Sequence, residues 1–226
     1  MEVLLIRHFE SFKNTARRLS STQDDEGLTP RGIERSTALA EKLSRFASAH
    51  SFVTKYLHCS SSKRGVETAE ILGRALSCDK IKKHAELRST NAGPYAGLSV
   101  RALQRKDSEW MEKFHLYKAG LLNLYNFDSE WQTEGKESKV EFEQRVLKCF
   151  REIVGQRNEP LKIIVANRSA IIAILISLAR ELYNYPNGFY GYVRVDLGSV
   201  SRVQRDNRGK WRIVGVNENW LIQHKL

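Results

Sequence analysis

Residues that could hold an anion follow three apolar segments of the sequence. Arg7 and His8 come directly after one short apolar run, Arg64 closes a serine-rich turn after a second, and Asn167 and Arg168 come after a third. Guanidinium groups pair bidentately with phosphate oxygens. A histidine beside them can serve as a nucleophile or as an acid or base. If the three segments meet in space, these residues predict a binding site for a phosphorylated or other anionic ligand.

The elements that carry these residues have the pattern of a buried sheet. The runs Val3–Ile6 and Leu161–Val165 are fully apolar apart from Lys162, which is typical of parallel strands covered on both faces. In open α/β sheets ligands bind at the carboxyl ends of the strands. Each polar strand end taken singly is also explained as an ordinary solvated turn. Three of them together favour a site.

Helical patterns separate the strands. Thr29 is a predicted N-cap and Pro30 the first helical residue, followed by an apolar stripe of Ile33, Leu39, Leu43 and Phe46. Further helices are predicted from 64 or 65 to 76 and over 170–182, and a terminal hairpin turns at "NRGK". This order predicts an α/β fold: a three-layer α/β/α sandwich with a mainly parallel, doubly wound sheet and an antiparallel C-terminal hairpin.

The length of the chain favours a single domain. Its 226 residues fit one large core over 1–226, and the helix-forming, aromatic-rich stretch 99–152 is predicted to be a helical cap insertion over one edge of the sheet. Such a cap would determine the substrate, although its aromatic residues are equally explained by core packing. Oligomeric state cannot be read from the sequence.

Composition narrows the class of protein. With 41% hydrophobic and 28% charged residues and a formal charge of +11, the chain reads as a soluble globular protein that favours anionic partners. Cys59, Cys78 and Cys149 lack C-x-x-C spacing, so neither a disulfide framework nor a metal site is predicted. The apolar N-terminal run is too short for a signal peptide, and no stretch is long enough to span a membrane. We expect a cytoplasmic location.

Several segments resemble one known family. "LLIRHFESFKN" resembles the R-H-G-x-[ST]-x-x-N opening of the histidine phosphatase superfamily, in its phosphoglycerate mutase-like branch. "LTPRGIERSTALAEKL", "CSSSKRGVETAEIL", "LRSTNAGPYAGLS", "EGKESKVEFEQRV" and the closing "LGSVSRVQ" with "WRIVGVNENWL" resemble later motifs of that family. Each motif is weak singly, but their order over nearly the whole chain is specific.

The resemblance implies a role for individual residues. His8 would be the nucleophile that forms a phosphohistidine, while Arg7 and Arg64 would hold the phosphoryl oxygens and stabilise the transition state. Asn14 matches the family asparagine that donates to the same phosphate, and Asn167 with Arg168 would complete the phosphate-binding set. The family mechanism requires no cofactor and no metal.

Three positions depart from the family pattern. Phe9 replaces a glycine, Ser89 stands where many members have a glutamate that protonates the leaving group, and Asn167 stands in place of the second histidine. A serine hydroxyl is a poor general acid at neutral pH. An asparagine can donate a hydrogen bond but cannot become cationic, although Arg168 could restore the charge.

Other residues could replace the missing acid. The sequence offers Glu10, Glu86, Glu112 and His115. Glu10 is favoured because it is adjacent in sequence to the His8 turn, but a solvated loop carboxylate is the simpler interpretation.

Four functional hypotheses follow. The first is a phosphatase or phosphotransferase that acts on a small phosphorylated substrate through His8, and the second is a degenerate member that binds a phosphorylated ligand or partner without efficient turnover. A third is polyanion binding through the basic segments "VRALQRK" and "SRVQRDNRGKWR", but charged surface explains these segments more simply and makes nucleic acid an unlikely partner. The fourth is reuse of the fold for a different reaction.

Overall fold

The computed structural model describes residues 1–19, 26–118, 135–156, 159–183 and 193–222. These residues contain a six-stranded sheet in the order β3-β2-β4-β1-β5-β6. The strands are β1 (Glu2–Arg7), β2 (Tyr56–Ser60), β3 (Lys80–His84), β4 (Leu161–Ala166), β5 (Val200–Arg205) and β6 (Trp211–Glu218). β1 to β4 run parallel, and β5 and β6 form an antiparallel hairpin beside β1. The fold class predicted from the sequence is confirmed.

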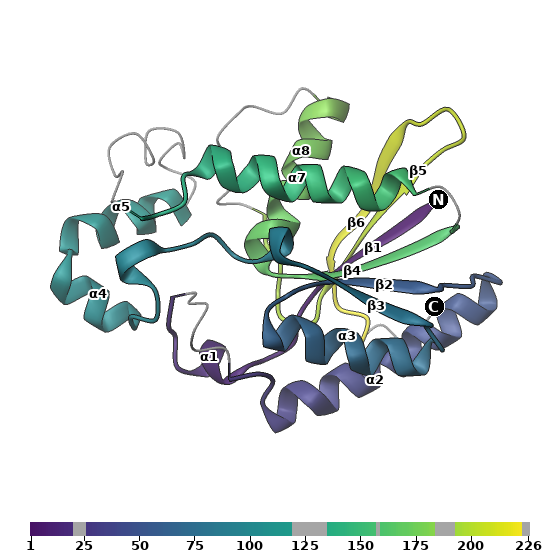
Figure 1. Ribbon diagram of the computed structural model, residues 1–226, viewed down its shortest axis with the longest axis horizontal. Helices are drawn as coiled ribbons and strands as arrows, with labels where there is room; N and C mark the ends of the chain where they lie inside the picture. Colours follow the sequence, from purple (N-terminus) through teal and green to yellow (C-terminus); the bar gives the residue numbers. More distant parts are fainter. Residues whose placement is uncertain (20–25, 119–134, 157–158, 184–192, 223–226) are drawn as a thin grey trace.

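Helices cover both faces of the sheet (Figure 1). α2 (Pro30–Ala49) and α3 (Lys63–Ala75) lie on one face, and α7 (Lys139–Gly155) and α8 (Arg168–Tyr183) lie on the other. Alternate residues of β1 serve the two layers: Val3 and Leu5 pack with α7 and α8, whereas Leu4 packs with α2 and α3. The unbroken apolar run of β1 is therefore explained by burial on both faces.

Helix α2 begins where the sequence predicts. The Thr29 hydroxyl accepts a hydrogen bond from the Gly32 amide at 3.0 Å, as an N-cap side chain should. Ile33, however, is 48% exposed, so its place in the predicted apolar stripe was wrong. The buried face of α2 starts at Gly32 and includes Ser36 and Ala40. Each residue turns an α-helix by about 100°, so Ile33, directly after Gly32, points away from that face.

Strand β3 was not predicted. Its sequence, "KIKKH", carries three lysines and lacks the apolar alternation of a half-buried strand. It lies at the edge of the sheet and pairs only with β2. Lysine-rich edge strands are common because charge discourages pairing with another chain.

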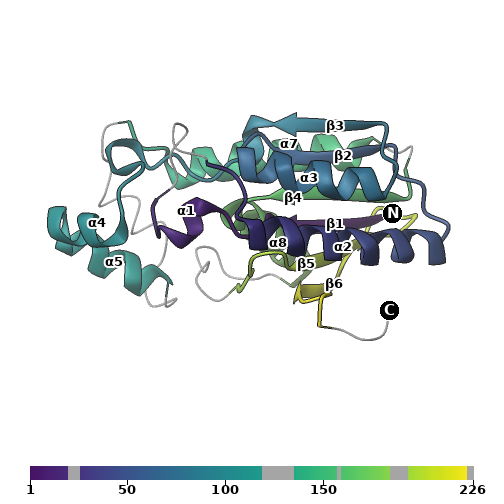
Figure 2. The same cartoon turned by 90° about the horizontal axis from the view of Figure 1, so that it is seen from below.

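The predicted insertion divides into two parts. The helices α4 (Val100–Lys106) and α5 (Ser108–Lys118) lie beyond the carboxyl ends of the parallel strands, clear of the sheet in both views (Figure 1 and Figure 2). α7 instead packs on the sheet and buries Phe142 and Val146. The predicted range 99–152 thus includes most of a sandwich helix, and its segment 119–134 lies outside the described residues.

Three short elements complete the described chain. α1 (Phe12–Thr15) follows β1, and the 3-10 turns η1 (Ala85–Leu87) and η2 (Gly93–Tyr95) follow β3. Among the described helices, none is both long and apolar enough to cross a bilayer.

Phe9 is accommodated by a glycine on a neighbouring loop. The Phe9 ring is 1% exposed and packs into the core. A Cβ atom added to Gly198 would lie 2.1 Å from Cε1 of that ring, and Gly198 has a positive φ of 72°. Gly198 therefore provides both the space for the bulky residue after His8 and a backbone conformation that other residues adopt at a cost.

Gly198→Ala should destabilise the fold by about 2–4 kcal/mol, because left-handed strain of roughly 1–2 kcal/mol adds to overlap with a buried ring. Gly209→Ala is the matched control, since Gly209 has φ 82° and a Cβ atom added there would lie no closer than 3.4 Å to its nearest neighbour, the flexible Arg205 guanidinium. Urea unfolding should show a clearly smaller loss for the control. Equal losses would contradict the close packing of Phe9 on Gly198.

Candidate functional site

The three predicted strand ends meet at one buried point. His8 follows β1, Arg64 lies in the first turn of α3 after β2, and Asn167 follows β4; they are 2%, 5% and 2% exposed. The Arg64 guanidinium joins the other two. Its Nε donates to Nε2 of His8 at 2.9 Å, and its Nη2 donates to Oδ1 of Asn167 at 3.0 Å.

The hydrogen bonds of His8 define its tautomer. Its Nδ1 lies 2.7 Å from the carbonyl oxygen of Phe9, which can only accept, so Nδ1 carries the proton. Nε2 then has a lone pair, which accepts from Arg64. Burial, and then the charges of Arg64 and Arg7, hold the pKa of His8 well below its ordinary value. His8 is therefore neutral at physiological pH, with its lone pair on Nε2.

Two further arginines add positive charge. Arg7 donates from Nη1 to the carbonyl oxygen of Val195 at 2.7 Å. Burial, with the charge of Arg168 next in size, lowers the pKa of Arg7 to about 10, which still leaves it protonated at neutral pH. Arg168 begins α8 rather than lying in a loop. Arg7 and Arg168 are thus close enough for their charges to interact, and both charges favour an anion.

The side-chain oxygen of Asn14 is bound within the turn that follows His8. This oxygen accepts from the backbone nitrogen of Ser11 at 3.1 Å and from the Ser11 hydroxyl at 2.7 Å, which caps the short α1. Its hydrogen bonds are thus directed to the local turn. A donor role toward phosphate would fall to the side-chain nitrogen of Asn14.

A cleft of about 670 Å³ opens onto this point. Arg64, Asn167 and Ser62 form one part of its lining, and Ser89 lies in another part. The remaining lining residues include the cations Arg88, Lys136 and Arg145 and the carboxylates Glu137 and Glu141. His8 is not among the described residues that line the cleft, but its Nε2 accepts a hydrogen bond from Arg64, which is.

One wall of the cleft is held together by an arginine that was not among the predicted site residues. Arg145 of α7 pairs with both carboxylate oxygens of Glu137, one of them at 2.8 Å. It also donates to the backbone carbonyls of Glu86, Arg88 and Ser89. Glu137 and Arg145 both lie in the segment "EGKESKVEFEQRV", whose resemblance to a family motif was the signal in the sequence that pointed to this pair. These hydrogen bonds hold in place the backbone of η1 and of the loop after it, which carries Ser89.

The candidate general acids proposed from the sequence lie elsewhere. None of Glu10, Glu86, Glu112 and His115 is among the described residues that line the cleft. Glu10 accepts from the Thr29 hydroxyl at 2.9 Å, and the side chains of Glu112 and His115 are exposed on α5. Of the carboxylates in the lining, Glu137 pairs with Arg145, and hydrogen bonds from Ser138 lower the pKa of Glu141.

A family model matches nearly the whole chain. The model of the histidine phosphatase superfamily (branch 1) matches residues 3–219. The chain belongs to the histidine phosphatase superfamily. It is also 29% identical over 223 residues to a protein named probable phosphoglycerate mutase from Proteus mirabilis, covering 99% of this chain and 91% of the relative.

Solved structures of other proteins share the fold of this chain. A mycobacterial glucosyl-3-phosphoglycerate phosphatase in complex with VO3 superposes with a TM-score of 0.76 at 20% identity, covering 96% of this chain and 99% of that one. An α-ribazole phosphatase from Shigella flexneri gives 0.73 at 21% identity, covering 96% of each chain. At these identities the likeness establishes the architecture.

The neutral state of His8 can be tested by NMR titration of its imidazole. The wild-type His8 resonances should not titrate near pH 6.5, because both burial and cationic neighbours disfavour the imidazolium. Arg64→Ala should raise the pKa of His8, although burial should keep it below the usual value. Arg74→Ala, at an exposed arginine of the same helix, is the control and should leave it unchanged. An ordinary pKa for His8 in the wild type would contradict the assignment.

Proposed function

We propose that this histidine phosphatase is a phosphomonoesterase or phosphotransferase that works through His8 on a small phosphorylated molecule. The supporting observation is the hydrogen bond from Nδ1 of His8 to the Phe9 carbonyl, which leaves the Nε2 lone pair beside Arg64. In the proposed reaction Nε2 forms a bond to phosphorus while the ester P–O bond breaks. Water, or an acceptor hydroxyl, then takes the phosphoryl group and regenerates neutral His8.

Arg64 would change partners as the substrate enters. Its Nε donates to Nε2 of His8, and a charged phosphoryl oxygen is a stronger acceptor than a neutral imidazole. Transfer of that donor to the phosphate would expose the lone pair at the moment when phosphorus arrives. Arg7 and Arg168 would add positive charge around the transferring group.

The departure of the leaving group is the weak step of this mechanism. Ser89, which the resemblance in sequence matches to the family glutamate, lines the cleft, and the two carboxylates of the lining are engaged by Arg145 and Ser138. A general acid typically contributes about 10²–10⁴ in rate. The proposed substrates are therefore phosphorylated molecules whose leaving group departs readily without a proton, and turnover of ordinary alkyl esters should be slow.

Two observations support a small phosphorylated substrate over a nucleic acid. The relatives are named for phosphoglycerate, glucosyl-3-phosphoglycerate and α-ribazole phosphate chemistry. The two basic segments, on α4 and on the β5–β6 hairpin, lie at opposite ends of the molecule in both views (Figure 1 and Figure 2). They therefore do not form one continuous cationic surface for a polyanion.

Comparison of leaving groups tests the proposal. p-Nitrophenyl phosphate, whose leaving group needs no proton, should be hydrolysed about 10²–10⁴ times faster than a simple alkyl phosphate in steady-state assays. His8→Ala should abolish both activities. Equal rates for the two esters would mean that a general acid acts in the cleft after all.

Restoring a carboxylic acid should reverse this preference. Ser89→Glu should raise kcat/KM for the alkyl phosphate by at least about tenfold while changing that for p-nitrophenyl phosphate only a few-fold. Thr90→Glu is the matched control, because it places the same charge at the adjacent lining residue. An equal gain in both variants would indicate an effect of charge alone, contrary to the assigned role of position 89.

A second candidate function is binding of a phosphorylated ligand without efficient turnover. The observation that favours it is the closed network in which Arg64 occupies both the His8 lone pair and the Asn167 carbonyl oxygen. Inorganic phosphate would then raise the Tm of the wild type and of His8→Ala alike, and p-nitrophenol release by the wild type would not exceed that of His8→Ala. Release that depends on His8 would exclude this candidate.

A further inference from the structure

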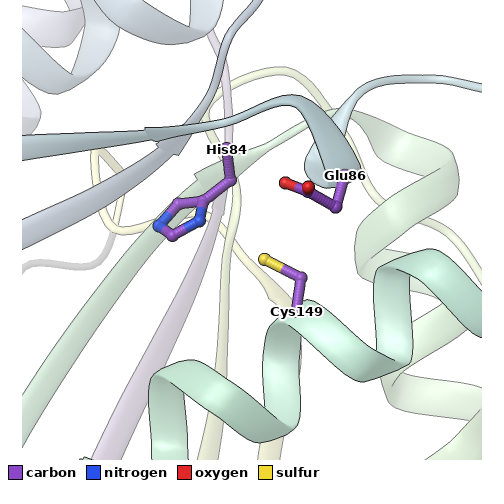
Figure 3. Close-up of side chains that lie close together, drawn as sticks. All are labelled: His84, Glu86 and Cys149. Atoms are coloured by element: carbon purple, nitrogen blue, oxygen red, sulfur yellow. The ribbon is translucent and has the colours of Figure 1, made fainter.

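A second cluster of reactive side chains lies outside the phosphate cleft. His84 at the end of β3, Glu86 in η1 and Cys149 on α7 place one ligand atom each within 4.8 Å of one another (Figure 3). None of the three lines the cleft. The set combines an imidazole, a carboxylate and a thiol, which are the three side-chain types that bind Zn²⁺ in proteins.

The imidazole of His84 is oriented by a buried neighbour. Nε2 of His84 lies 3.0 Å from Nδ1 of His58, and the two rings stack with centroids 5.2 Å apart. This leaves Nδ1 as the nitrogen of His84 on the side of Cys149 (Figure 3). A metal-binding histidine usually donates its second ring N–H to a partner that fixes the ring, and His58 can accept that hydrogen.

The charges around Cys149 favour a cation. Cys149 is 2% exposed, and burial followed by the charges of Glu86 and Glu152 raises the pKa of its thiol to about 12. The carboxylates that disfavour a thiolate would stabilise a divalent metal ion at the same place. Opposing charges come from Lys82, which acts on His84 from the same strand, and from Arg145, whose guanidinium donates to the backbone carbonyl of Glu86. The site is thus locally acidic in a chain of formal charge +11.

We propose that His84, Glu86 and Cys149 bind a divalent transition-metal ion of the zinc class. Tetrahedral bonds of about 2.0–2.3 Å place ligand atoms roughly 3.3–3.8 Å apart, so the cluster must contract by about 1 Å. Glu86 is exposed and can supply that movement by a change of rotamer. Water or the carboxylate of Glu152 would occupy the fourth position.

The bound ion would fasten two elements that also form the cleft. η1 leads into Arg88 and Ser89, and α7 carries Arg145, whose guanidinium already binds the backbone of residues 86, 88 and 89. A metal on His84, Glu86 and Cys149 would join the same two elements and the end of β3. The ion would stabilise the wall of the cleft without taking part in phosphoryl transfer.

Cobalt spectroscopy tests the site directly. Untagged protein, treated with a chelator and then freed of it, is titrated with Co²⁺. The expected result is a thiolate-to-cobalt charge-transfer band with intense tetrahedral d–d absorption, saturating at about one equivalent and abolished by Zn²⁺. At a free Zn²⁺ concentration of about 100 times Kd, Tm should rise by roughly 5–10 °C.

Variants assign the signal to the three residues. Cys149→Ser should lose the charge-transfer band, and Glu86→Gln, at an exposed position, should weaken affinity by about 10–100-fold or more while leaving the fold intact. Cys78→Ser is the control, because Cys78 is half-buried next to Asp79 but lies outside the cluster. Absence of the band in the wild type, or its survival in Cys149→Ser, would overturn the proposal, as would undiminished affinity in Glu86→Gln.

Discussion

The candidate phosphate site depends on the hydrogen bonds that the buried guanidinium of Arg64 makes. The guanidinium joins the end of β1, through His8, to the end of β4, through Asn167, while Arg64 itself begins the helix after β2. A buried cation must be hydrogen-bonded, and His8 and Asn167 are neutral acceptors. Protonation of His8 would place a second cation against Arg64. The fold therefore holds His8 in its neutral form, and an arriving phosphate would bring negative charge to Arg64.

Much of this arrangement could be predicted from residue patterns. The apolar runs before His8 and Asn167 indicated buried parallel strands, whose carboxyl ends necessarily meet at one edge. The Thr29–Pro30 start of α2 and the "NRGK" hairpin turn follow from local chemistry that operates over a few residues. These predictions are confirmed because each depends on short-range constraints or on the geometry of parallel sheets.

The remaining features arise from contacts between distant segments. β3 is an edge strand, and its lysines remove the hydrophobic alternation by which a strand is predicted. The exposure of Ile33 depends on which face of α2 meets α3. Arg145 binds the backbone of residues 86, 88 and 89, and Phe9 packs on Gly198. Both sets of contacts join residues more than fifty positions apart in the sequence. The cluster of His84, Glu86 and Cys149 likewise lacks metal-ligand spacing, because three separate elements supply it.

The central claim is that Nε2 of His8 attacks phosphorus, and trapping the intermediate tests it most directly. Enzyme and p-nitrophenyl phosphate are mixed, quenched in alkali within the first turnover, and analysed by ³¹P NMR and peptide mass spectrometry. The account predicts a burst of p-nitrophenol together with phosphohistidine at Nε2 of His8, because Nδ1 is occupied by the Phe9 carbonyl. Turnover with the phosphoryl group on any other residue, or on Nδ1, would contradict it.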